Sequence, residues 1–118
     1  MPPGSTDSSI DALGRDLDRL ADRLRTMSEA RLAGAVPGWA SRAAAARAVA
    51  QACADAAAGL REEPVRTLPV LSDLAVGDQL AVCGHDLVAA LRAAPPEADR
   101  AEEIRGTRHR LDVLARLT

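Results

Sequence analysis

The sequence predicts an all-α protein, a four-helix up-down bundle in which a helical hairpin is followed by two further helices. Apolar residues recur at alternating intervals of three and four along much of the chain, which is the rhythm of helix faces. Alanine, the strongest helix former, fills 26 of the 118 positions. There is one Trp and no Phe or Tyr, whereas strands favour aromatic and β-branched residues. The core is therefore expected to be aliphatic and helical.

The length and composition indicate one folded domain. A chain of 118 residues is near the commonest domain size, and an apolar fraction of 47% beside a charged fraction of 27% argues against wholesale disorder. We expect residues 1–7 to be a disordered lead and residues 8–118 to form a single helical-bundle domain.

The first predicted helix has the most regular pattern in the chain. It begins at Ser8 or Ser9, either of which suits an N-cap, and its pattern fades near Gly34. Charged residues fill the face opposite the apolar one, and the 3-4 spacing of the apolar face is that of a coiled-coil seam. The seam residues are Ile10, Leu13, Leu17, Leu20, Leu24 and Met27.

The second predicted helix spans residues 39–60 and follows the turn residues Val36-Pro37-Gly38. Its long run of alanines gives high helix propensity and a smooth surface. Such a helix can approach a neighbour closely but buries little area by itself. We expect the large side chains of the first helix to supply the packing that it lacks.

A connector with two prolines, residues 61–69, leads to a third predicted helix over residues 72–93. Gly77 and Gly84 interrupt the apolar stripe of this helix. Each costs about 1 kcal/mol relative to alanine. Two explanations are open: another helix approaches closely along the glycines, or the helix is hinged at Gly84.

The fourth predicted helix spans residues 97–117, after Pro95-Pro96. Its first turns are acidic and its last turns basic, an order that complements the helix dipole. Four helices with short connections are typical of an up-down bundle.

The charge of the chain gives no general attraction to nucleic acid. All 15 basic residues are Arg and the net charge is −2, so no overall field draws the protein to a polyanion. The arginine bias is typical of a GC-rich genome such as an actinobacterial one. One local cluster, Arg105, Arg108, His109 and Arg110, supports a second hypothesis, a small nucleic-acid-associated regulator. A solvated helix end explains the same cluster without any ligand.

No motif indicates catalysis, a cofactor or a metal, so we expect a protein that is not an enzyme. Asp78 and His85 share a helix face but are separated by about 10 Å along the axis, too far to be two ligands of one ion. No nucleophile elbow or phosphate-binding loop is present. A metal-binding or enzymatic bundle with a site around Asp78, His85 and Cys83 is the third hypothesis.

Cys53 and Cys83 lie in apolar helical stretches. Buried free thiols are the simpler interpretation, because free cysteine behaves as a small core residue. A disulfide between the two helices is the alternative.

Trp39, the only aromatic residue, either plugs one end of the bundle or is an exposed anchor for a partner, because Trp is enriched at interface hot spots. We expect the interaction surface to include this residue, the leucines of the first seam and the glycines of the third helix. The candidate interaction residues are Trp39, Leu17, Leu20, Leu24, Gly77 and Gly84.

The stretch Pro37-Gly38-Trp39-Ala40-Ser41-Arg42-Ala43-Ala44-Ala45-Ala46-Arg47, placed between a heptad-like helix and an Ala-rich helix, resembles the WXG100 family of helical hairpins associated with type VII secretion. The resemblance covers residues 8–62. Ser41 stands where that family usually has Gly, and no Tyr is present for the family's C-terminal secretion signal. The resemblance implies a homo- or heterodimer of small helical proteins without enzymatic activity.

The leading hypothesis is therefore a protein–protein interaction module that docks on itself or on another small helical protein as a dimer. No signal peptide and no run of about 18 uninterrupted apolar residues is apparent, so we expect a cytoplasmic protein without a membrane span. Export is expected only if a partner supplies the signal.

Overall fold

A computed structural model describes residues 5–96 and 98–118 and confirms the all-α class. Those residues form no strand; Val36 and Trp39 make a single isolated bridge. The elements are α1 (Ser5–Arg25), α2 (Glu29–Ala33), α3 (Arg42–Leu60), the 3₁₀ turn η1 (Asp73–Ala75), α4 (Val76–Ala93) and α5 (Arg100–Arg116).

Both ends of the expected bundle are shifted. Residues 5–7, expected in the disordered lead, are the first residues of α1, and residues 1–4 lie outside the described residues. Position 97, expected to begin the last helix, also lies outside them. The described helix α5 begins at Arg100, because the Asp99 side chain accepts a hydrogen bond from the Glu102 amide (3.1 Å) and caps it.

The first expected helix is divided in two. α1 ends at Arg25, and Ser28 starts α2 by accepting a hydrogen bond from the Arg31 amide (3.2 Å). Met27 lies in the bend between them and is buried, so the apolar seam continues past the end of α1. A serine that satisfies a free amide favours a new helix start over continuation.

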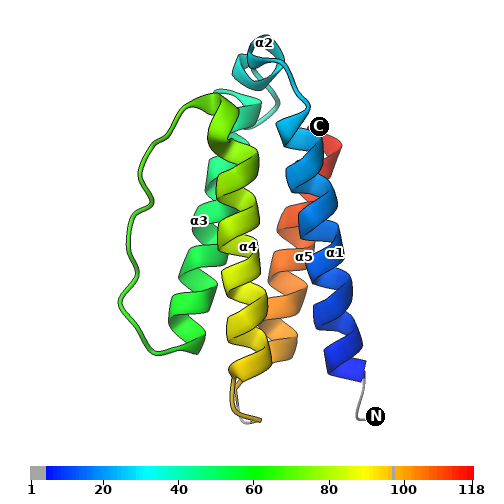
Figure 1. Cartoon of the computed structure of the whole chain (residues 1–118), viewed down its shortest axis with the longest axis vertical. Helices are drawn as coiled ribbons and strands as arrows, with labels where there is room; N and C mark the ends of the chain where they lie inside the picture. Colours follow the sequence, from blue (N-terminus) through cyan, green and yellow to red (C-terminus); the bar gives the residue numbers. More distant parts are fainter. Residues whose placement is uncertain (1–4, 97) are drawn as a thin grey trace.

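The four long helices lie side by side, but their directions do not alternate (Figure 1). Arg47 pairs with Asp73 near the start of α3 and α4 (2.5 Å), and Arg61 pairs with Asp86 further along both (2.8 Å). α3 and α4 are therefore parallel, and the expected up-down order is wrong for this pair of helices.

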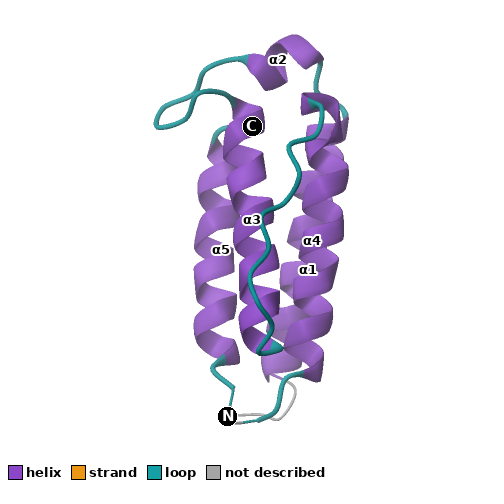
Figure 2. Cartoon of the chain, turned by 90° about the vertical axis from the view of Figure 1, so that its left-hand side faces the viewer, coloured by secondary structure: helices purple, strands orange, loops and turns teal. Residues whose placement is uncertain are grey.

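The segment 61–72 makes the parallel order geometrically possible. It returns along the full length of the bundle in an extended path beside α3 (Figure 2). The Gln51 side chain of α3 forms two hydrogen bonds with the backbone of this segment. It donates to the Arg66 carbonyl (2.9 Å) and accepts from the Leu68 amide (2.9 Å). The connection between α3 and α4 is therefore long, and the expectation of short connections is wrong for it. The long path is stable because the backbone groups of the connector form hydrogen bonds with a helix surface.

α1 and α3 do not form the expected hairpin. Each long helix packs mainly on two neighbours, in the ring α1–α4–α3–α5, so α1 and α3 are diagonal. The most extensive packing joins α4 to α1 and to α3, and α5 packs more sparsely.

Glycine allows α1 and α4 to approach closely, as one of the two explanations from the sequence predicts. A Cβ built on Gly77 would lie 2.8 Å from the Ala21 carbonyl oxygen, and one built on Gly84 would lie 2.8 Å from Leu17 Cδ2. α4 is one continuous helix through Gly84, so the hinge explanation is wrong.

The central position of α4 accounts for its apolar composition. The segment Asp73–Ala93 contains an 18-residue window with a mean hydropathy of 1.3, so by length and composition alone it is long and apolar enough to cross a membrane. Of this window, 61% is buried inside the bundle. Because α4 packs against α1 on one side and α3 on the other, its apolar residues are explained as core residues of the bundle.

A buried apolar stripe and an ion pair both join α5 to the bundle. Arg108 of α5 pairs with Asp16 of α1, which also pairs with Arg19. Burial acts to raise the pKa of Asp16, but the hydrogen bonds from Arg19 and Arg108 outweigh it, and the pKa is lower than usual. Asp16 therefore stays ionised and paired as the pH falls toward its normal titration range.

Both cysteines are free and buried, as the simpler interpretation predicts. Burial raises the pKa of the Cys53 thiol to about 12, with a smaller contribution from Cys83. Burial also raises the pKa of the Cys83 thiol. Both side chains therefore act as neutral core residues.

The close α1–α4 contact predicts opposite effects for glycine replacements. Gly77→Ala should lower the free energy of unfolding by about 1–3 kcal/mol, because the added methyl group meets the Ala21 carbonyl, which cannot move alone. Gly84→Ala should cost less, because it meets a flexible leucine. Gly14→Ala is the control: its Cβ would be 3.7 Å from Val88, so helix propensity should stabilise it by about 0.5–1 kcal/mol. Urea denaturation measures all three, and equal effects at Gly77 and Gly14 would contradict the contact.

The buried thiols predict slow chemical modification of the native protein. At pH 8 a thiol with a pKa of about 12 is almost entirely protonated, and the thiolate is the reactive form. Labelling of Cys53 by a thiol-specific disulfide reagent should be slow in buffer and fast after unfolding in guanidinium. Native labelling at the unfolded rate would show that the thiol is accessible.

Candidate protein interaction site

Five of the six candidate interaction residues face the interior of the bundle. Leu17, Leu20 and Leu24 are at most 5% exposed, and Gly77 and Gly84 are buried against them or their neighbours. The seam that was expected to dock on a partner is filled by α4 of the same chain. Its residues offer no free surface in this structure.

The sixth residue, Trp39, lies on the surface with 42% of its area exposed. It ends a four-residue turn in which its amide donates to the Val36 carbonyl (3.1 Å). Pro37 is the second residue of the turn, and Gly38, with φ of +83°, is the third. Proline followed by a residue with positive φ is typical of a type II turn. Local sequence therefore fixes the backbone that presents the indole.

Arg42 fixes this turn to the rest of the bundle. Its amide donates to the Gly34 carbonyl (3.0 Å), which closes the segment between α2 and α3. Its guanidinium donates to the Leu117 carbonyl after α5 (2.7 Å) and to the Arg31 carbonyl of α2 (2.9 Å). One side chain thus holds the Trp39 segment against the end of α5.

Beside Trp39, an open and mainly apolar groove of about 350 Å³ lies between α3 and α5. On the α3 side most of the lining residues are alanines, whose short side chains leave space in front of α5. The lining residues are Trp39, Ala45, Ala48, Val49, Ala52, His109, Arg110, Val113, Leu114 and Leu117.

The ionisable residues of this Trp39 groove are both basic. His109 and Arg110 are exposed, and neither forms an ion pair with any residue that the structure describes. The nearest acidic residue of the same helical turn, Asp112, lines a different groove on the α1 side of α5. The Trp39 groove therefore combines apolar walls with uncompensated positive charge.

Ion pairs within the chain divide the basic cluster that was proposed to bind nucleic acid. Arg105 pairs with Glu102 (2.5 Å) and Arg108 pairs with Asp16 of α1. Half of the cluster is thus neutralised within the chain, and the other half lines the Trp39 groove. Because affinity for nucleic acid depends on the number of free cations along the phosphates, this arrangement weakens the second hypothesis.

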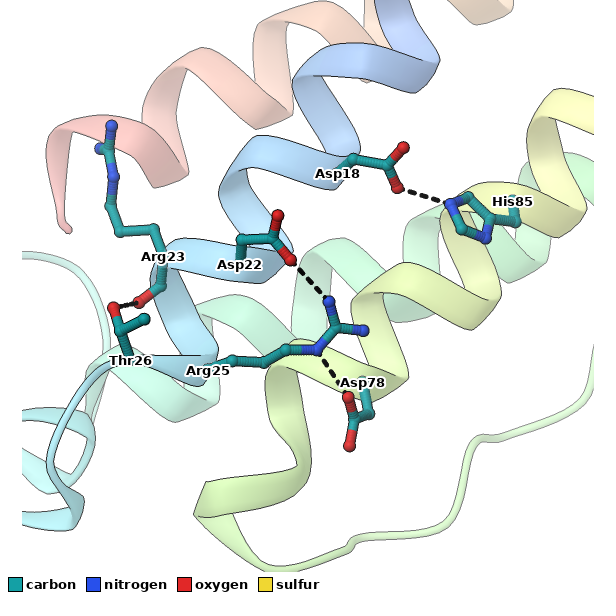
Figure 3. Close-up of polar contacts among 7 residues, drawn as sticks. All are labelled: Asp18, Asp22, Arg23, Arg25, Thr26, Asp78 and His85. Atoms are coloured by element: carbon teal, nitrogen blue, oxygen red, sulfur yellow. Dashed lines mark hydrogen bonds and ion pairs between the residues drawn. The ribbon is translucent and has the colours of Figure 1, made fainter.

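Two of the three residues of the metal or enzyme hypothesis, Asp78 and His85, pair with different residues of α1 (Figure 3), and the third, Cys83, is a buried free thiol. His85 Nε2 lies 2.5 Å from Asp18 Oδ1, and Arg25 donates to Asp78 (2.6 Å) and to Asp22 (2.8 Å). The described part of the chain contains no group of three or more His, Cys, Asp or Glu side chains that could hold a metal ion. These contacts explain the side chains as links between α1 and α4.

No protein-family model matches the sequence, and no curated protein or solved structure matches it either. The Trp39 groove and the residues that line it are therefore the structural features that bear on function.

Proposed function

We propose that this protein is a non-enzymatic helical module that binds a partner protein through the Trp39 groove. The observation that supports the proposal is a half-exposed Trp, the only aromatic residue of the chain, on a tethered turn beside an apolar groove. A large side chain held in one position loses little entropy on binding, and Trp is enriched among interface hot spots.

The remaining surface supports the choice of this face. The α1 seam, the alternative docking face, is already occupied by α4. Other exposed apolar side chains, such as Val82 on α4 and Val65 in the connector, have no groove beside them among the described cavities. Isolated apolar residues are normal on protein surfaces.

The resemblance of residues 8–62 to WXG100 proteins supplies a cellular context for the proposal. In that context the protein is a cytoplasmic partner in an actinobacterial secretion-related system, and the bound protein is another small helical protein. The diagonal placement of α1 and α3 differs from the direct hairpin of simple members. We therefore place the interface at α3 and α5 and not at an α1–α3 pair.

Replacing the indole tests this function. In the organism that carries the gene, tagged wild-type protein should recover a specific partner, and Trp39→Ala should reduce its recovery by about 30-fold, equivalent to a hot spot of about 2 kcal/mol. Quantitative mass spectrometry of cross-linked and purified complexes measures this change.

Val82→Ala is the matched control, because it removes a more exposed apolar side chain (69%) from α4, outside the groove. It should recover the partner as the wild type does. A Trp39→Ala variant with unchanged helical circular dichroism and an unchanged set of recovered proteins would refute the function.

A further inference from the structure

We propose that the segment bound in the Trp39 groove is an acidic amphipathic helix whose carboxylates meet Arg110. This inference rests on the proposed function and adds the chemistry of the partner. The shape of the groove, its charge and the arrangement of the two helices that form it support this partner.

The shape of the groove suits a third helix. α3 and α5 are antiparallel, since Arg42 at the start of α3 reaches Leu117 beyond the end of α5. The α3 wall spans residues 45–52, about two helical turns or 10 Å. Alanines at intervals of three and four allow close approach of a partner backbone, and anchors at i, i+3 or i+4 and i+7 are the usual way a helix fills such a groove.

The charge of the groove selects an acidic partner. Arg110 carries five N–H donors in a planar fork that matches a carboxylate, and within residues 5–96 and 98–118 it forms no ion pair with an acidic side chain. It lies over Gly106, where an added Cβ would be 3.3 Å from the guanidinium. The absence of a side chain at position 106 leaves space for Arg110 along the surface of α5.

The same charge disfavours a second copy of this chain in a groove-to-groove dimer. A two-fold arrangement places equivalent surfaces against each other, so the basic residues of the two grooves would be brought together. Like charges at an interface suppress association. An oppositely charged helix satisfies Arg110 and fills the apolar walls at the same time.

Two designed peptides test the proposal with the intact protein. Both are about 18 residues long, which permits helix formation, and share one leucine and alanine pattern without Trp. One carries Glu at every charged position and the other carries Lys. Trp39 emission of the protein reports binding directly, because no other residue of the chain is aromatic. The Glu peptide should bind at least about tenfold more tightly than the Lys peptide at low salt, and the ratio should fall as salt rises.

Charge variants locate the effect. Arg110→Gln should remove the preference for the Glu peptide, and Arg110→Glu should reverse it. The control Arg15→Glu changes the net charge as much as Arg110→Glu does, but on α1, outside the groove. It should leave the preference for the Glu peptide unchanged. Thermal unfolding of each variant checks that the bundle is intact.

The outcomes distinguish the groove as a binding site from the acidic chemistry of its partner. Binding to Trp39→Ala, which has no Trp emission, is measured by isothermal titration calorimetry. Equal binding of both peptides to the wild type, lost in Trp39→Ala, keeps the groove as an interaction site but overturns its acidic partner. Binding of neither peptide, or a preference unchanged in Arg110→Glu, also overturns it. A wild-type protein of twice the chain mass that becomes monomeric in Trp39→Ala assigns the groove to a second copy. The co-purification experiment tests the function independently of all of these results.

Discussion

The close approach of α1 to α4 is the contact on which the rest of the structure depends. Leu17 packs where Gly84 has no side chain, and Gly77 admits the backbone of α1 at Ala21. Each fully buried leucine contributes about 1.5–3 kcal/mol, so the regular seam of α1 is a large part of the stability of a core without aromatic rings. Two glycines that weaken an isolated helix thus strengthen the bundle, because dispersion attraction grows as the two helices come closer.

Because α4 takes the position beside α1, the Ala-rich α3 packs on α4, and the wall that α3 turns toward α5 consists mainly of alanines. The connector 61–72 makes this order possible by returning along α3, where Gln51 binds its backbone. α5 is held chiefly by its apolar stripe, by Arg108 on Asp16 and by Arg42 at its end. The space left between α3 and α5 becomes the Trp39 groove. The candidate site is therefore a consequence of how the core is filled.

The sequence predicts the parts of this structure that depend on local pattern. The 3-4 spacing of leucines predicts α1, the alanine run predicts α3, and the glycines of α4 predict a close helix neighbour. The order of helices in space is not encoded locally. No local pattern in the connector indicates that it returns beside α3. Its backbone meets the Gln51 side chain, its hydrogen-bond partner, only in the folded chain. Likewise, the exposure of Trp39 depends on Arg42 reaching the distant Leu117, and the separation of Arg108 from Arg110 depends on Asp16 of another helix.

The central claim is that the α1 seam is filled by α4 of the same chain and is not waiting for a partner. Native-state hydrogen exchange of the isolated monomer at low concentration tests this claim most directly. Amides of α1 and α4 should be the most protected and should open only with global unfolding, while residues 61–72 and the Trp39 turn exchange earlier. Exchange in α1 as fast as in the connector, with protection gained only when the protein concentration rises, would contradict the account.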